Sequence, residues 1–202
     1  MRKTASRPAV VSHETPFQVL ISTVLSQRTR DENTATASKQ LFKSFPTAER
    51  LSKAPLCKIE KLIRPAGFYR TKAKRIKAIS ILLVEQFGGQ PPGSLAQLLS
   101  LPGVGRKTAN CVLVYAFKKP ALPVDVHVHR ISNRLGLVET KTPGQTEQAL
   151  MLAVPKENWL ELNHLMVRYG QKICLPRNPK CLECGLRFKC PFFLKASAKK
   201  QV

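Results

Sequence analysis

The stretch LPGVGRKTANCVLVYAFKKPALPVDVHVHRISNRLGL, residues 101–137, decides the fold. It opens on two glycines one residue apart, Gly103 and Gly105, which let the backbone turn tightly and approach a ligand closely. We predict that this turn joins two helices and that the second begins at Arg106. The free N–H groups at such a helix start bind phosphate, and a neighbouring arginine and lysine strengthen the binding. The turn therefore predicts a contact with a phosphate backbone.

The second half of the same stretch allows two interpretations. Val124–His129 alternates between apolar and polar residues, which by itself is typical of a strand. Asp125 can instead be the N-cap of a helix that carries Val128, Ile131 and Leu135. Because an isolated strand has no partner in an otherwise helical chain, we predict the cap.

Helical periodicity dominates the rest of the chain. Apolar residues recur every three or four positions within residues 17–25, 76–87 and 159–169. Clusters of proline and glycine separate such segments, and Ser94 is the predicted N-cap of a short helix through Ser100. The predicted fold class is all-α.

The chain is strongly basic. Its 202 residues include 34 Lys plus Arg against 12 Asp plus Glu, a net charge of +22. Such an excess, spread along the chain, favours nucleic acid as a partner, with an anionic membrane as the alternative. No apolar run approaches the ~20 residues that span a bilayer. The N-terminal segment MRKTASRPAVVS lacks the apolar region of a secretory signal, so we expect neither secretion nor a membrane partner.

Four cysteines near the C-terminus have the spacing C-x6-C-x2-C-x5-C: Cys174, Cys181, Cys184 and Cys190. Without a secretory signal, such a cluster favours metal binding over disulfides. The chemistry alone allows zinc or an iron–sulfur cluster. The two cysteines outside this pattern, Cys57 and Cys111, are predicted to be buried apolar thiols.

Residues 101–137 resemble the helix–hairpin–helix and the Gly/Pro-rich loop ending in aspartate of the endonuclease III family. The resemblance extends from about Phe17 to Cys190. It implies the helix–hairpin–helix DNA glycosylase fold, with two helical domains and a DNA-binding cleft between them. Residues 17–123 would form a helical barrel domain, and residues 1–16 with 124–202 the cluster domain. The cysteine spacing is similar to that of the family's [4Fe–4S] site, which implies this cluster in place of zinc, in a structural role.

The resemblance also implies, by position, that Lys107 is the nucleophile and Asp125 the second catalytic group. Removing a base and cutting the strand requires an unprotonated amine that attacks the sugar at C1′ and forms a Schiff base. A lysine reaches that form when desolvation or neighbouring cations lower its pKa. A carboxylate can stabilise positive charge on the sugar and assist proton transfer. Singly, each residue would be a solvated charge or a cap; the pair beside the hairpin favours catalysis.

A glycosylase must also extrude the target nucleotide and fill the gap that it leaves. In the family's first gap-filling loop, Arg28 stands where a glutamine is frequent and Gln27 directly precedes it, so either can enter the stack. Phe68 takes the wedge position of the second loop, with core packing as the alternative. His127 is a candidate pocket residue.

Two groups of basic residues lie near these segments, and we predict a different placement for each group. We predict that four that follow Phe68 form a solvated helix face, with phosphate contact as the alternative: Lys72, Lys74, Arg75 and Lys77. Five others surround the cysteines, where they would present cations to a DNA backbone: Lys172, Arg177, Lys180, Arg187 and Lys189.

The resemblance implies a bifunctional DNA glycosylase and AP lyase of base-excision repair that removes oxidised pyrimidines from duplex DNA and cleaves the strand by β-elimination. The expected partner is double-stranded DNA with a damaged base or abasic site, bound by a monomer in the cytoplasm of a prokaryote, at the nucleoid. Two alternatives remain. A monofunctional mismatch glycosylase usually lacks the lysine at position 107, and a non-enzymatic DNA-binding module would not require Lys107 and Asp125 together.

Overall fold

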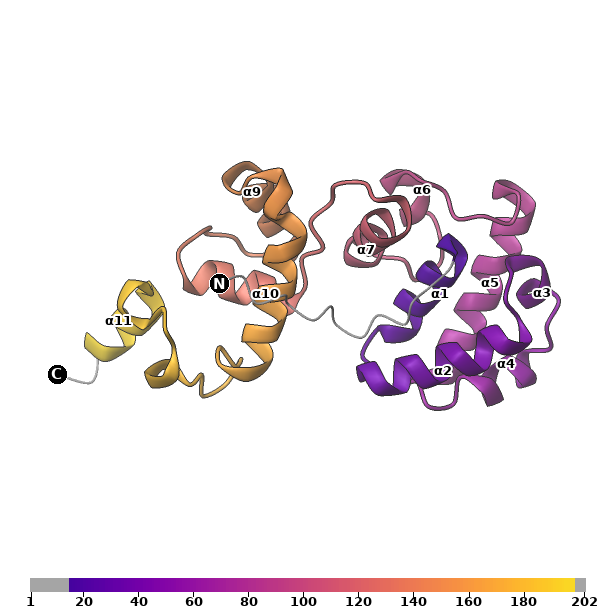
Figure 1. Ribbon diagram of the computed structural model, residues 1–202, viewed down its shortest axis with the longest axis horizontal. Coiled ribbons are helices and arrows are strands. Elements are labelled where there is room, and N and C mark those ends of the chain that lie inside the picture. Colours follow the sequence, from indigo (N-terminus) through magenta and orange to yellow (C-terminus); the bar gives the residue numbers. More distant parts are fainter. Residues whose placement is uncertain (1–14, 199–202) are drawn as a thin grey trace, which may run out of the picture. The chain divides into compact units, whose positions relative to one another are not determined.

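The computed structural model describes residues 15–198, which contain helices, turns and irregular segments but no strand. The all-α prediction is therefore confirmed. The chain divides into two compact units, one ending at Lys119 and one beginning at Pro120 (Figure 1). The division into a domain of residues 17–123 and a domain of residues 1–16 with 124–202 stays a prediction. Residues 1–14, which belong to the second of these domains, lie outside the described residues.

Helix α1 is the central element of the first unit and packs against α2, α5 and α7 (Figure 1). Its apolar residues at positions 17, 20, 21, 24 and 25 are all buried, as the periodicity predicts. The helices of this unit are α1 Pro16–Ser26, α2 Asp31–Ser44, α3 Ala48–Ser52, α4 Leu56–Leu62, α5 Tyr69–Phe87, α6 Leu95–Leu99 and α7 Arg106–Phe117.

In the second unit, α8 packs against both α9 and α10. The helices of this unit are α8 Val126–Arg134, α9 Pro143–Ala153, α10 Trp159–Lys172 and α11 Pro191–Ala198, with 3-10 turns at Lys156–Asn158, Cys181–Glu183 and Arg187–Lys189. Its core is an apolar cluster of buried side chains: Leu122, Val124, Val128, Ile131, Leu150, Trp159 and Met166. This core fixes α8, the helix that begins beside Asp125.

Side-chain caps set the starts of several helices. The Asp125 carboxylate accepts hydrogen bonds from the N–H groups of His127 (2.9 Å) and Val128 (3.0 Å), so α8 begins at Val126 and the strand alternative is wrong. Ser94 caps α6 as predicted, although this helix ends at Leu99. Two aspartate-to-backbone bonds replace the partners that N–H groups at a helix start lack.

The two isolated cysteines differ. Cys111 is buried in α7, whereas Cys57 is exposed, so the prediction of a buried thiol is wrong for Cys57. Helix α4 buries Ile59, and a residue two positions earlier points away from that face because helical residues advance by about 100° each.

None of the helices within residues 15–198 combines the length and apolar composition that a membrane crossing requires.

Candidate nucleic-acid interface and cysteine site

The turn between α6 and α7 uses its two glycines for different purposes. Gly103 has φ +76°, a left-handed conformation that favours glycine, and a Cβ there would lie 2.7 Å from Cδ of Arg75. Gly105 has φ −91°, and no atom lies within 4 Å of the position its Cβ would take. Gly103 is therefore required by the turn itself, while Gly105 leaves open space directly in front of α7.

The start of α7 is open to a ligand. Gly105 is its N-cap and no side chain caps the helix, so first-turn N–H groups keep their capacity to donate. Arg106 and Lys107, the first two helical residues, are both exposed. Lys107 makes no hydrogen bond or ion pair with any residue of the described chain. The predicted phosphate-binding helix start thus has the geometry and the cations that its chemistry needs.

Gln27 and Arg28 point in different directions. The half-buried Gln27 donates from Nε2 to the carbonyl oxygen of Gly103 (3.0 Å) and to Oγ1 of Thr108 (3.2 Å). Its amide is therefore committed to the hairpin. Arg28 is exposed, and its φ of 51° lies in the left-handed region. Of the two candidates, Arg28 carries the side chain that is accessible to a partner.

Phe68 is the N-cap of α5, with a φ of 57° and 65% of its surface exposed. The alternative that it packs in the core is therefore wrong. A non-glycine residue in the left-handed region costs about 1–2 kcal/mol, and such strain persists only where the surroundings hold it. An exposed aromatic side chain on a strained backbone is a feature that favours a binding role over a packing role.

Lys72 contradicts the prediction of a solvated basic face. Only 2% of its surface is exposed, and its Nζ donates to the carbonyl oxygens of Leu25 (2.6 Å) and Gln27 (2.6 Å) and to Oγ1 of Thr29 (2.7 Å). Burial, and then the charge of Arg75, lower the pKa of Lys72 to about 8. The side chain is therefore still predominantly an ammonium ion at neutral pH.

The other three residues of the predicted basic face divide in the same way. Lys77 also turns inward, where its Nζ donates to the carbonyl oxygen of Ala54 at 2.9 Å. Lys74 and Arg75 are exposed as predicted, and the side chain of Arg75 lies against Gly103. Position 72 lies on the same helical face as the buried residues Ile76 and Ile79, so the apolar periodicity contained the signal that Lys72 is buried.

Asp125 and His127 both lie at the start of α8. Both capping bonds use Oδ1 of Asp125, and its Oδ2 has no hydrogen-bond partner within residues 15–198. The Nη2 of Arg130 lies 3.0 Å from Nδ1 of His127 and also donates to the carbonyl oxygens of Gly170 and Cys174. Because arginine can only donate, Nδ1 accepts and the neutral ring keeps its proton on Nε2. One carboxylate oxygen thus remains available for chemistry.

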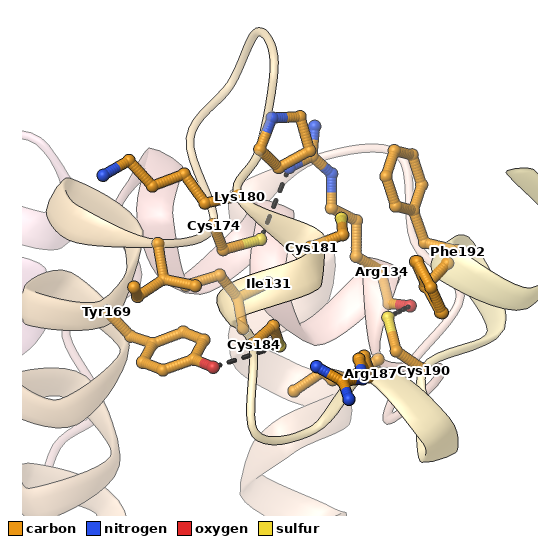
Figure 2. A pocket seen from close by; sticks show the side chains of 14 residues that line it. Ile131, Arg134, Tyr169, Cys174, Lys180, Cys181, Cys184, Arg187, Cys190 and Phe192 are labelled. Carbon is orange, nitrogen blue, oxygen red and sulfur yellow. Dashed lines mark hydrogen bonds between the residues drawn. The ribbon is translucent and has the colours of Figure 1, made fainter.

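The four predicted metal-binding cysteines line one pocket that is partly open to solvent (Figure 2). Figure 2 shows two donors directed at their sulfurs. The Arg134 Nη1 donates to Sγ of Cys174 at 3.3 Å, and the Tyr169 hydroxyl donates to Sγ of Cys184 at 3.0 Å. Burial, followed by the hydrogen bond with Cys184, raises the pKa of Tyr169 to about 12, so its hydroxyl keeps the proton that it donates.

The lining of this pocket bears on the kind of group that it could hold. Within residues 15–198, no three side chains of the metal-binding types approach closely enough to share a single metal ion. The cysteines instead surround a common space whose wall also includes Ile131 and Phe192. Donors such as Arg134 and Tyr169 compensate negative charge on thiolates. Four thiols around an apolar space, with donors to their sulfurs, are the chemistry that an iron–sulfur cluster requires.

The candidate site residues therefore fall into two groups. In the first unit, hydrogen bonds connect Gln27 to the hairpin, and Lys72 and Thr29 join the segments that carry Arg28 and Phe68. In the second unit, Arg130 and Arg134 connect α8 with the first cysteine of the pocket. Sequence reasoning missed Thr29, Arg130 and Arg134, whose residue types carry no distinctive signal.

Comparison with known proteins gives consistent results. Residues 21–156 match the family model described as HhH-GPD superfamily base excision DNA repair protein. Endonuclease III of Thermotoga maritima is 58% identical over 88% of this chain and 84% of the relative. Endonuclease III of Bacillus subtilis is 38% identical over 88% of this chain and 82% of the relative.

Solved structures agree with these matches. A trapped endonuclease III–DNA covalent intermediate has a TM-score of 0.85 and 37% identity, covering 92% of this chain and 87% of that one. A thermostable thymine-DNA glycosylase has a TM-score of 0.79 and 28% identity, covering 90% of this chain and 85% of that one. Both similarities extend over nearly all of this chain.

The two hairpin glycines should respond differently to substitution. We expect Gly103→Ala to lower the free energy of unfolding by about 1–3 kcal/mol, because its Cβ would meet Arg75 and its backbone is left-handed. Gly105→Ala should leave the free energy of unfolding within about 0.5 kcal/mol, because it meets no atom, yet weaken DNA binding by obstructing the approach of a phosphate. Urea unfolding and fluorescence anisotropy with a DNA duplex measure the two effects. Equal DNA binding by Gly105→Ala and wild type would show that no phosphate approaches at Gly105.

Proposed function

Because this chain belongs to the endonuclease III family of the HhH-GPD superfamily of base excision DNA repair proteins, we propose that it is a DNA glycosylase and AP lyase that removes oxidised pyrimidines from duplex DNA. The observation that carries this proposal is the exposed amine of Lys107 in the first turn of α7, directly after an uncapped, glycine-containing turn. An amine at this place lies beside the backbone groups that hold a phosphate.

The hairpin binds the DNA backbone in this proposal. The N–H groups at the start of α7 donate to a phosphate, and the adjacent Arg106 adds positive charge. Gly105 provides the space for this approach, since a larger residue would place a side chain in front of the helix. These contacts ignore base sequence and hold the strand while the damaged nucleotide leaves the stack.

Lys107 performs the covalent step in this proposal. Its unprotonated amine attacks C1′ of the extruded nucleotide, the bond between C1′ and the base breaks, and the base departs with a proton. The C1′–O4′ bond of the sugar ring then opens, O4′ takes a proton, and the Schiff base that forms at C1′ makes the C2′ proton acidic. Loss of that proton breaks the C3′–O bond, which cleaves the strand, and hydrolysis of the Schiff base returns the lysine.

Asp125 and His127 support this chemistry. The Oδ2 of Asp125 can stabilise positive charge that develops on the sugar and assist proton transfer, while Oδ1 remains occupied with the helix cap. His127 is the candidate pocket residue, and Arg130 fixes its ring through Nδ1. Arg28 and Phe68, which are exposed on strained turns, are the side chains that we propose to fill the gap in the duplex.

We further propose that Cys174, Cys181, Cys184 and Cys190 hold a [4Fe–4S] cluster. A tetrahedral zinc site, with Zn–S bonds of about 2.3 Å, brings its sulfurs to roughly 3.8 Å from one another. The four cysteines line one apolar pocket, and within residues 15–198 no three side chains of the metal-binding types are placed to share one ion. The cluster would fix the cation-rich segment between the first and last of these cysteines, which suits a structural role in DNA binding.

Two alternatives remain testable. A monofunctional mismatch glycosylase is supported by the 28% identity to a thymine-DNA glycosylase, but the exposed Lys107 beside the hairpin favours lyase activity. A non-enzymatic DNA-binding module would need neither Lys107 nor Asp125.

We propose that the protein acts as a monomer on double-stranded DNA, at the nucleoid in the cytoplasm of a prokaryotic cell.

Borohydride trapping tests the role of Lys107. Reduction of the Schiff base should produce a stable covalent adduct between the wild-type protein and a duplex that contains one thymine glycol, visible as a band shift in a denaturing gel. We expect no adduct with Lys107→Gln, since an amide cannot form a Schiff base. Lys39→Gln, which removes an exposed lysine of α2, is the matched control and should be trapped like wild type.

Three results of this trapping experiment separate the functions. An adduct that depends on Lys107 supports the bifunctional enzyme. Base release without an adduct would favour the monofunctional glycosylase. Binding of the duplex with no base release would favour the non-enzymatic module.

Substitution of Asp125 can separate its cap from its catalytic role. Asn is as good an N-cap as Asp, so Asp125→Asn should change the free energy of unfolding by less than about 0.5 kcal/mol, whereas Asp125→Ala should lower it by about 1 kcal/mol. Both variants should slow single-turnover base excision by about a hundredfold, because both lose the carboxylate charge. Wild-type excision by Asp125→Asn would reduce this residue to a helix cap.

Iron analysis tests the cluster. The purified protein should contain about four irons per chain and absorb visible blue light, and Cys184→Ser should lose most of both. Cys57→Ser is the control, because that exposed thiol lies outside the pocket and should leave iron content unchanged. A colourless protein with about one zinc per chain would contradict the cluster and favour the zinc alternative.

A further inference from the structure

We propose that Lys72 is a positioning residue for base extrusion. Its buried ammonium, acting with the hydroxyl of Thr29, holds Arg28 and Phe68 at a fixed separation so that both enter the duplex as one unit. The inference rests on the proposed glycosylase function, because only a base-extruding enzyme uses these two side chains together.

The environment of Lys72 is unusual for a lysine. A charged ammonium is rarely excluded from solvent unless every proton has an acceptor, because burial of an unpaired charge is costly. Here three acceptors lie at 2.6–2.7 Å from Nζ, which matches the three N–H bonds of an ammonium group. The group is therefore fully bonded in this one position and has little freedom to take another.

All three acceptors belong to one short segment, residues 25–29, at the C-terminal end of α1. The carbonyl oxygens of Leu25 and Gln27 lie where a helix ends and its last carbonyls lack partners. A cation is favoured there by the helix dipole as well as by the hydrogen bonds. Lys72 thus anchors the backbone on both sides of Ser26, directly before the exposed Arg28.

Thr29 extends the anchor to the second loop. Its Oγ1 accepts from Nζ of Lys72 at 2.7 Å and also from the N–H of Gly67 at 3.1 Å. Gly67 directly precedes Phe68, and a Cβ at Gly67 would lie 3.1 Å from the carbonyl oxygen of Arg28. The two segments that carry the exposed side chains are therefore in contact and share one hydroxyl group.

The backbone on both segments needs such support. Arg28 (φ 51°) and Phe68 (φ 57°) both occupy the left-handed region, although neither is glycine. Each conformation costs about 1–2 kcal/mol, and it is maintained only where surrounding contacts exclude the relaxed alternatives. The bonds of Lys72 and Thr29 flank both residues, which makes them the contacts best placed to supply that constraint.

The same segment is tied to the hairpin. Gln27, whose carbonyl oxygen accepts from Lys72, donates its side-chain amide to the carbonyl oxygen of Gly103. The gap-filling side chains are therefore held relative to the turn that grips phosphate. Since a misplacement of about 1 Å can cost a hundredfold in rate, loss of this constraint should impair extrusion more than the chemistry that follows.

A purely structural lysine would give a different pattern, and two substrates distinguish the cases. Excision of thymine glycol from a duplex requires extrusion, whereas β-elimination at an abasic site in a single strand does not. For Lys72→Met in the full-length, iron-loaded protein, we expect single-turnover excision from the duplex to fall about a hundredfold. Cleavage of the single-stranded abasic site should stay within about threefold of wild type.

Lys77→Met is the matched control. Lys77 lies on the same helix and also donates to a backbone carbonyl, that of Ala54, but it has no bond to either loop. The control should lower thermal stability to a similar degree while both activities stay near wild type. Equal losses of both activities in Lys72→Met, or unchanged excision from the duplex, would overturn the proposal.

Substitution of Thr29 provides an independent test should Lys72→Met fail to fold. Thr29→Val removes the shared hydroxyl but keeps the side-chain volume, so it should show the same selective loss, whereas Thr29→Ser should restore excision. Equal excision by both variants would contradict the proposal. Failure of the wild-type protein to excise thymine glycol would count against the proposed function itself, which separates the two conclusions.

Discussion

A buried positive charge must be surrounded by oxygen atoms, and this requirement organises the part of the first unit that carries Arg28, Phe68 and the hairpin. The ammonium of Lys72 finds its three oxygens on the segment that ends α1, so this segment cannot move without leaving the charge unpaired. Thr29 and Gln27 then extend the same network to the turns before Phe68 and at Gly103. Three loops far apart in the sequence are thereby fixed by one cation.

A different arrangement holds in the second unit, where the two carboxylate oxygens of Asp125 differ in their partners. One of its oxygens caps α8, and the other stays free of partners within the described chain. Further along α8, Arg130 bonds to the backbone of Cys174, and Arg134 donates to its sulfur. A single helix therefore begins at the carboxylate and contacts the cysteine pocket further along.

The sequence predicted the features that depend on local chemistry. The helical periodicity, the N-caps at Ser94 and Asp125, and the start of α7 at Arg106 follow from neighbouring residues alone. Long-range contacts could not be predicted in this way. Lys72 was expected in solvent because lysines usually are, and the carbonyl oxygens that bind it lie more than forty positions away. Cys57 was expected to be buried because free cysteines usually are, but it lies on the exposed face of α4.

On the proposal that Arg28 and Phe68 fill the gap in the duplex, their left-handed backbone has a consequence for the search along undamaged DNA. The chain incurs this conformational cost once, when it folds, and the free protein already presents both side chains in their strained turns. An encounter with an intact base pair therefore spends no free energy on ordering loops, and release from it recovers none. Such a surface can sample many sites briefly, and selectivity then depends on how easily each base leaves the helix.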